Sequence, residues 1–363
     1  SWDRAINGRA NYGFNDGIEN DHIGNDNVYT DSETYYITGL QYAVNQAYLQ
    51  MVKRDADGDI AYETARVPEN KSGGSQTIQY PVLDDDYWND AVKYGERIQV
   101  WVGAGTYVSN AGLFMRDGVD VLGGFPASGY PGVNERNPRV GENETILQGG
   151  VPGPQLHGNG DSGGSLYDLN QNYDNANTTR RVLTQPMPYY DYGENGLDVE
   201  RTNKEVNGFK ATTTWNGFTI QGGSTQISHQ REGGAGVALR QNGVLENCVI
   251  RNNVNTVLAS GRGGGIFCNG GTLINCRIED NELARSNESG GRAVFGGGIY
   301  LRYGTTFNCV YTGNKLDDGA LQYGMGLGSA IYIERGNFFN NTVTANEGSI
   351  ALAIGKYFQE SQL

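Results

Sequence analysis

The second half of this 363-residue chain carries a repeated step of asparagine followed by cysteine. The four steps are Asn247-Cys248, Asn275-Cys276, Asn308-Cys309 and the variant Asn340-Asn341. Their second residues follow one another at intervals of 28, 33 and 32 positions. A period of this size indicates stacked structural repeats, in which each unit contacts its neighbours along one axis.

Each step lies within a longer pattern. A glycine-rich segment precedes a short apolar alternation, as in the strings Gly263-Gly264-Gly265-Ile266 and Gly296-Gly297-Gly298-Ile299. The step is followed two residues later by a larger side chain and five residues later by asparagine. These residues are Ile250, Ile278, Tyr311 and Val343, then Asn253, Asn281, Asn314 and Asn346, and Phe218 with Ile220 begin the series one unit earlier. Each repeat therefore reads as glycine turn, strand, turn, strand and asparagine turn.

A unit of two or three short strands cannot bury its own apolar face. Coils stacked about 4.8 Å apart can join these faces into one core, and equivalent residues then form ladders. Glycine suits corners that need a positive φ; asparagine tolerates that conformation, and its amide can bond to its neighbour in the next coil. The pattern predicts an all-β solenoid, a parallel β-helix.

The first half has similar but less regular strands. Residues 97–107 place Ile98, Val100 and Val102 inward, and further strands are expected at 118–125 and 145–147. Before them, apolar residues recur at helical spacing over 33–51, with Ser32 as a cap. They are Tyr36, Leu40, Ala43, Val44, Ala47 and Met51. We expect this helix to cover the open end of the solenoid.

These patterns divide the chain into three parts. Residues 1–96 form a capping segment with a helix and acidic loops, including a projecting loop at 54–90. Residues 97–350 form the β-helix, with a long loop insertion at about 151–207, and residues 351–363 form a C-terminal tail. Long loops of this kind are where solenoids usually carry function.

The repeats resemble a known superfamily. The strings NGFTIQGG at 216–223, GGGIFCNGGTLINCRIEDN at 263–281 and GGGIYLRYGTTFNCVYTGN at 296–314 are similar to the pectin-lyase-like right-handed parallel β-helix superfamily. More narrowly, they resemble repeats of polymorphic outer-membrane proteins and of surface proteins of Bacteroides-type bacteria. The resemblance covers residues 97–150 and 208–350 and implies a right-handed coil. It does not fix an activity, because this scaffold carries lyases, hydrolases, adhesins and passengers of unknown role.

Charge and hydropathy limit the partners. The chain has 41 acidic and 27 basic residues, a formal net charge of −14. Binding to nucleic acid requires clustered Lys and Arg, so we expect no nucleic-acid partner. No run approaches the roughly 20 apolar residues of a membrane span. We expect a secreted or cell-surface protein that is not transmembrane, although no export signal precedes Ser1 in this sequence.

The four cysteines, Cys248, Cys268, Cys276 and Cys309, contain no CxxC pair, which disfavours zinc and redox chemistry. Two arrangements fit them: a stacked row of small buried thiols, or disulfides between coils. We favour free thiols, because buried cysteine commonly behaves as a small apolar residue.

A Gly-Asp-Ser-Gly-Gly string surrounds Ser162 and is similar to the segment around the nucleophile of chymotrypsin-like proteases, including immunoglobulin A proteases. That chemistry needs a histidine base upstream. His22 lacks the expected context, and His157 is only five residues away. A serine endopeptidase is therefore an alternative to a glycine-rich surface loop.

Asp55, Asp57 and Asp59 are spaced like the first ligands of a calcium loop. Ile60 replaces the expected glycine, and Arg66 replaces the expected final glutamate. A calcium site is one interpretation, and a solvated acidic turn is the other. We expect no other cofactor.

Sugar chemistry would need paired carboxylates or a base with cations. Asp317 and Asp318 are an adjacent acidic pair in the coil region, so a polysaccharide lyase or hydrolase is a further alternative. Binding without catalysis needs no such arrangement of charged groups. The tyrosine cluster in the expected loop insertion, Tyr189, Tyr190 and Tyr192, is the best candidate contact for a sugar ring or protein. We expect a binding or adhesion module whose partner is a glycan or a host surface protein.

Overall fold

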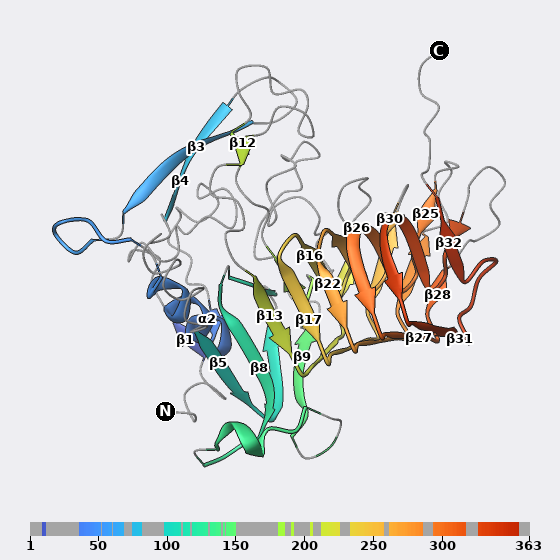
Figure 1. Ribbon diagram of the computed structural model, residues 1–363, viewed down its shortest axis with the longest axis horizontal. Helices are drawn as coiled ribbons and strands as arrows, with labels where there is room; N and C mark the ends of the chain where they lie inside the picture. Colours follow the sequence, from blue (N-terminus) through green and yellow to red (C-terminus); the bar gives the residue numbers. More distant parts are fainter. Residues whose placement is uncertain are drawn as a thin grey trace.

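The computed structural model shows a stack of parallel coils, which confirms the predicted β-helix (Figure 1). The residues described are 9–11, 36–51, 53–59, 61–68, 75–81, 98–109, 112–116, 118–129, 131–138, 141, 143–149, 181–185, 190–191, 204–205, 212–225, 233–257, 261–285, 293–316 and 326–355.

The largest sheet has twelve strands, and every pairing in it is parallel. β26 and β30 are each nine residues long. Each spans two stretches of the coil that are separate strands in the preceding coil, where β21 and β22 both pair with β26. The strands are β5 (Gln99–Gly103), β7 (Leu113–Phe114), β8 (Asp120–Phe125), β10 (Leu183–Thr184), β13 (Thr213–Asn216), β16 (Val237–Arg240), β17 (Gly243–Glu246), β21 (Ile266–Asn269), β22 (Thr272–Ile274), β26 (Ile299–Phe307), β30 (Ile331–Phe339) and β32 (Leu352–Ile354).

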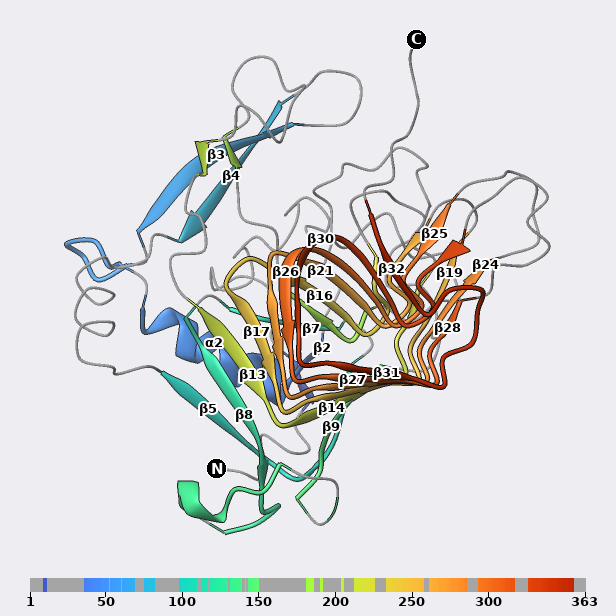
Figure 2. The same cartoon turned by 45° about the vertical axis from the view of Figure 1, so that its right-hand side comes forward.

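A second parallel sheet has seven strands and forms another side of the coil (Figure 2). Its members are β6 (Gly105–Ser109), β9 (Thr145–Gly149), β14 (Phe218–Gln221), β18 (Val249–Arg251), β23 (Arg277–Glu279), β27 (Val310–Thr312) and β31 (Thr342–Thr344).

Two smaller parallel sheets complete the coils. One contains β15 (Ser224–Thr225), β19 (Val254–Val257), β24 (Glu282–Arg285) and β28 (Lys315–Leu316). The other contains β20 (Gly261–Arg262), β25 (Val294–Phe295) and β29 (Gly326–Leu327). A short 3₁₀ helix, η2 (Val133–Glu135), follows β8.

The core is a set of in-register apolar rows inside the coils. Ile220, Ile250, Ile278 and Tyr311 occupy one row, which Val343 continues at the last coil. The first four of these are almost completely buried, and Val343 is half-buried. Since burying one large aliphatic side chain stabilises by about 1.5–3 kcal/mol, these rows hold the coils together. The predicted series of larger residues is thereby confirmed.

The asparagines divide into two rows with different tasks. Asn253, Asn281 and Asn314 are fully buried, and each Nδ2 donates to the Oδ1 of the next coil's asparagine, ending at Asn346. The three donor–acceptor distances are 2.9, 3.0 and 3.0 Å. This is the predicted amide ladder, and it satisfies polar groups that would otherwise be unpaired in the core.

The asparagines of the Asn-Cys steps form the second row, and they make the left-handed turns of the coil. Asn247, Asn275, Asn308 and Asn340 all have a positive φ, between 50° and 55°. Three of their side chains also bond to one another at the surface, where Asn340 Nδ2 donates to Asn308 Oδ1 and Asn308 Nδ2 to Asn275 Oδ1. Asn247 Nδ2 donates to Asn216 Oδ1 instead. From the sequence, one asparagine is expected to adopt the left-handed conformation and to form the ladder. In the structure the asparagines of the Asn-Cys steps adopt the left-handed conformation, and other asparagines form the buried ladder.

The glycine triplets fit the same ladder. Gly263 has a φ of +68°, as the corner requires. Gly265 faces Asn281, and a Cβ added there would lie 2.6 Å from the Cγ of that asparagine. The triplet therefore provides both the turn and the space for the buried amide row.

The helix α2 (Gly39–Leu49) covers the N-terminal end of the stack, beside β5 (Figure 1). Leu40, Val44 and Met51 are buried in the same core as the coils. The side chain of Gln41 also imitates a strand: Oε1 accepts from the N–H of Phe114 at 2.6 Å, and Nε2 donates to its carbonyl at 3.2 Å. The predicted cap is present and binds the edge strand β7 directly.

The helix begins later than predicted. Tyr36–Thr38 forms β2, which pairs antiparallel with β1 (Arg9–Asn11), so Ser32 is not its cap and Tyr36 is not on its apolar face. The aromatic and β-branched residues Tyr36, Ile37 and Thr38 favour a strand locally. The prediction from helical spacing alone therefore placed the start of the helix too early in the chain.

Three other predicted boundaries change. Within the expected loop at 54–90, β3 (Tyr62–Pro68) and β4 (Ser75–Pro81) form an antiparallel pair. Within the expected insertion at 151–207, β10 pairs between β7 and β16, and β11 (Tyr190–Asp191) pairs with β12 (Lys204–Glu205). Beyond residue 350, β32 pairs with β30, so the coils extend into the predicted tail. The strands β10, β11, β12 and β32 have only two or three residues, too few for a periodic signal. The seven-residue β3 and β4 do not alternate strictly between apolar and polar residues.

All four cysteines have free, buried thiols, as predicted. Cys248, Cys276 and Cys309 form one row, in which the backbone N–H of Cys276 donates to the Sγ of Cys309 at 3.4 Å. Cys268 lies on a different strand, β21. Asn341 ends the row, and its Oδ1 accepts from the N–H of Cys309.

We predict that Asn281→Ala lowers the free energy of unfolding by about 3 kcal/mol, because the buried backbone N–H of Asn253 loses its side-chain acceptor and the Ile250 carbonyl and Asn314 Oδ1 lose a donor in the core. Urea denaturation measures the change. Asn308→Gly, in the exposed row, keeps the positive φ and should cost less than about 1 kcal/mol. Equal losses in the two variants would show that the ladder is not a special source of stability.

Burial raises the pKa of Cys268 from 9.0 to about 12. Between these values the folded protein keeps a proton that the unfolded chain releases, so this residue's contribution to stability falls as pH rises from 9 to 12. We expect Cys268→Ala to reduce the slope of stability against pH in that window, measured by urea denaturation. An unchanged slope would contradict the raised pKa.

Candidate functional site

Most of the predicted site residues lie outside the described part of the chain. They are Ser162, His22, Asp317, Asp318, Tyr189 and Tyr192. Of the tyrosine cluster, only Tyr190 is placed, as the first residue of β11. The protease, sugar-chemistry and tyrosine-contact hypotheses therefore stay predictions from the sequence.

The acidic turn after α2 lies within the described residues, and one of its carboxylates is bound by backbone N–H groups of the same turn. Asp55 Oδ1 accepts from the backbone N–H groups of Asp57 and Asp59, each at 3.0 Å. The backbone N–H of Asp55 in turn donates to the carbonyl of Asp59 at 2.9 Å. Such a side chain closes a turn by itself. In the described ranges, no three His, Cys, Asp or Glu residues gather to hold a metal ion.

A continuous row of hydrogen-bonding side chains runs along the outer face of the seven-stranded sheet. We call it the polar row. Because the strands pair in register, it contains one residue from each of six successive strands. Its members are Gln148, Gln221, Arg251, Glu279, Thr312 and Thr344. Neighbouring strands are about 4.8 Å apart, so the row presents polar groups at a regular spacing along the axis.

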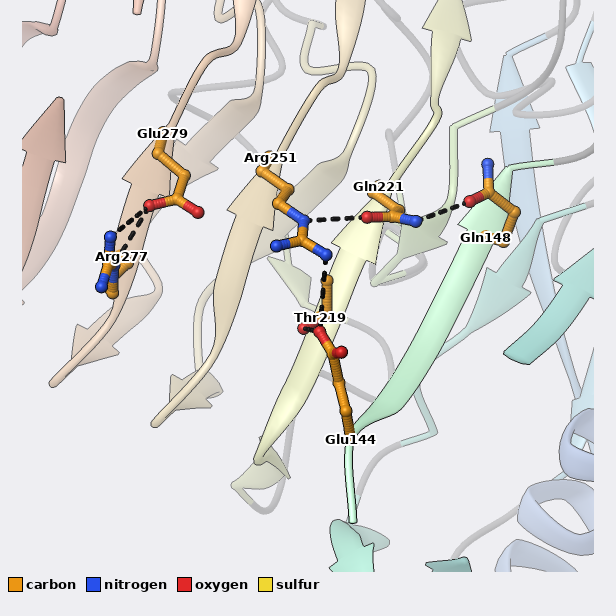
Figure 3. Close-up of polar contacts among 7 residues, drawn as sticks. All are labelled: Glu144, Gln148, Thr219, Gln221, Arg251, Arg277 and Glu279. Carbon is orange, nitrogen blue, oxygen red and sulfur yellow. Dashed lines mark hydrogen bonds and ion pairs between the residues drawn. The ribbon is translucent and has the colours of Figure 1, made fainter. Parts of the chain in front are cut away.

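Arg251 organises the first half of the polar row (Figure 3). Its Nε donates to Gln221 Oε1 at 2.9 Å, and Gln221 Nε2 donates to Gln148 Oε1 at 2.8 Å. Its Nη2 lies 3.5 Å from Glu144 Oε1, which also accepts from the Thr219 hydroxyl at 2.8 Å. Thr219 is buried, the other four residues are half-buried, and the hydrogen bonds hold these side chains in fixed orientations.

The next part of the face has its own ion pair. Arg277 Nη2 lies 2.7 Å from Glu279 Oε2. Figure 3 marks this contact with dashed lines. Three half-buried aliphatic residues, Ile146, Val249 and Val310, each lie two positions before the polar-row residue of their own strand. Thr219 and Arg277 alternate with them in register. The face therefore combines fixed polar groups with separate aliphatic side chains.

Sequence reasoning did not identify this face, although the repeat contained a signal. Arg251, Glu279, Thr312 and Thr344 each come three residues after the second residue of the Asn-Cys step or its variant. The position is polar in every repeat, which the search for catalytic motifs overlooked.

A second cluster lies outside the coils, where aromatic rings stack on the outer side of the twelve-stranded sheet. Phe267, Tyr300 and Tyr332 follow one another at centroid distances of 5.6 Å. The Arg262 guanidinium lies 4.9 Å from the Tyr300 ring centroid, and the Tyr300 hydroxyl donates to Glu334. Burial raises the pKa of Tyr300 and lowers that of Arg262. With Phe295 and Leu327 also in contact, this cluster packs the three-stranded sheet against the outer side of the twelve-stranded sheet.

Comparison with known proteins supports the fold. Residues 194–359 match the family model described as a right handed beta helix region. No curated protein and no solved structure matches the chain. Together with the parallel coils, the match identifies this part of the chain as a right-handed β-helix, consistent with the pectin-lyase-like superfamily.

We predict that Asp55→Ala speeds hydrogen exchange of the Asp57 and Asp59 amides by about tenfold, since both lose their acceptor. Calcium should leave the exchange in the unmodified protein unchanged. NMR-detected exchange measures both effects. A calcium-dependent slowing that Asp57→Asn removes would instead identify a metal-binding loop.

Proposed function

We propose that this β-helix is a secreted or cell-surface binding module that recognises a glycan through the polar row. No described helix is both long enough and apolar enough to cross a bilayer. The proposal rests chiefly on one observation, the network in which Arg251 joins Gln221, Gln148 and Glu144 on a solvent-facing sheet.

The chemistry of the face suits a ligand rich in hydroxyl groups. Carboxylate and amide oxygens accept hydrogen bonds from such groups, and guanidinium and amide nitrogens donate to them. Because the side chains already hold one another, a ligand would not have to pay the full entropy of ordering them. The aliphatic side chains of Ile146, Val249 and Val310 beside the row offer contact to the apolar face of a sugar ring.

A binding role also makes the smallest demand on the residues present. A lyase or hydrolase would need carboxylates and a base brought together, and a serine endopeptidase would need a histidine beside Ser162. Those alternatives depend on residues outside the described ranges, whereas the polar row is built from described ones.

We predict that the double variant Arg251→Ala/Gln221→Ala weakens binding to glycan-array hits at least tenfold, which is about 1.4 kcal/mol. Both side chains lie on the outside of the coil, so the folded core should persist, as circular dichroism can verify. The array should include plant, microbial and mucin-type glycans. The dissociation constant of each hit is then measured by calorimetry.

The matched control is Arg335→Ala/Asn337→Ala, which removes the same kinds of group from β30 in the twelve-stranded sheet. It should bind array hits like the unmodified protein. The proposed function is wrong if no glycan binds, or if both double variants weaken binding equally.

A further inference from the structure

We infer that a second surface, on β26 and β30, binds an acidic and apolar peptide segment of a partner protein. We call it the aromatic–arginine surface, and it comprises Tyr303, Arg335, Phe307 and Phe339. It lies on a different sheet from the polar row and does not depend on the proposed glycan function.

The aromatic side chains of this surface are unusually exposed for their size. Tyr303, Phe307 and Phe339 are 48%, 46% and 54% exposed. Phe307 and Phe339 are register partners on neighbouring strands, so their side chains leave the sheet on the same side. Adjacent exposed apolar side chains of this size are typical of interaction sites.

The backbone at Tyr303 is strained. The pairing of β26 with β30 shifts register around Arg302, and Tyr303 has a φ of 57°. The equivalent of Tyr303 in the preceding coil is Gly270, because Asn269 pairs with Arg302 and Thr272 pairs with Thr305. Gly270 has a φ of +100°. A tyrosine in this conformation costs stability that glycine would not. Bulges and strained residues of this kind often direct a side chain to a functional role.

Tyr303 positions a guanidinium group. Arg335 Nη1 donates to the Tyr303 hydroxyl at 3.1 Å, and its Cζ lies 5.3 Å from the ring centroid. Arg302 is also near this ring, but it is 3.7 Å from Glu334. Within the described part of the chain, Arg335 has no carboxylate at ion-pair distance. It therefore presents donors to solvent in a protein whose net charge is −14.

These groups define the partner by charge and spacing. A guanidinium with open donors binds a carboxylate in a two-pronged geometry. Tyr303 and Phe307 are four residues apart, so the charged and apolar ends of the surface are separated by about 13 Å along the strand. An extended segment with an acidic residue at one end and an aromatic or aliphatic residue at the other matches both. Tyrosine, arginine and phenylalanine are also enriched in protein interfaces.

The test uses a displayed library of random ten-residue peptides as the probe. We expect selected peptides to combine Asp or Glu with an aromatic or aliphatic residue. Arg335→Glu and Phe307→Ser/Phe339→Ser should each weaken their binding at least tenfold, measured by fluorescence anisotropy, and added salt should weaken it further. Arg277→Glu and Val133→Ser, which change an exposed arginine and an exposed apolar residue elsewhere, should leave it unchanged.

Tyr303→Gly provides a readout that a purely structural role would not give. It should raise the melting temperature by relieving strain while weakening peptide binding at least fivefold. The inference is wrong if no acidic and apolar peptides are selected, or if Arg335→Glu binds them as well as the unmodified protein. It is also wrong if Arg335→Glu abolishes binding to array glycans instead, since the surface would then be a glycan site.

Discussion

The hydrogen bonds between successive coils are the constraint on which the rest of this structure depends. They require equivalent residues to lie directly above one another, so each position of the repeat becomes a row. An apolar residue at one position gives a strip of core, and a buried asparagine gives a ladder of amides. The same register creates the polar row outside, because a hydrogen-bonding residue at that position recurs in every coil. Core and candidate site are therefore two sides of one repeat.

Much of the coil could be predicted because its causes are local and repeated. Asn281 and Gly265 have recurrent equivalents, and each needs only its neighbours in the next coil to explain it. The strand β10 could not be predicted in this way, because its two residues form a strand only through pairing with β7 and β16. The contact of Gln41 with Phe114 joins residues 73 positions apart and has no sequence signature.

The candidate sites were predicted less well, for a different physical reason. Sequence reasoning searched for motifs in which neighbouring residues share one reaction. The network around Arg251 instead joins residues from three coils, with Glu144 lying 107 positions away. The Asp55 turn shows a different ambiguity, because a spacing that suits a metal also suits a carboxylate that accepts from its own backbone. The calcium interpretation stays a prediction.

The two asparagine rows also give the coil an electrical direction. In the buried row each amide nitrogen points toward the C-terminal end, from Asn253 to Asn281 and onward to Asn346. In the surface row the amide nitrogens point the opposite way, from Asn340 to Asn308 and from Asn308 to Asn275. Aligned amides polarise one another, so each row acts as one extended dipole and its bonds strengthen together. Since the rows are opposed, their fields along the axis partly cancel, and a stack of coils can lengthen without accumulating a large dipole from its asparagines.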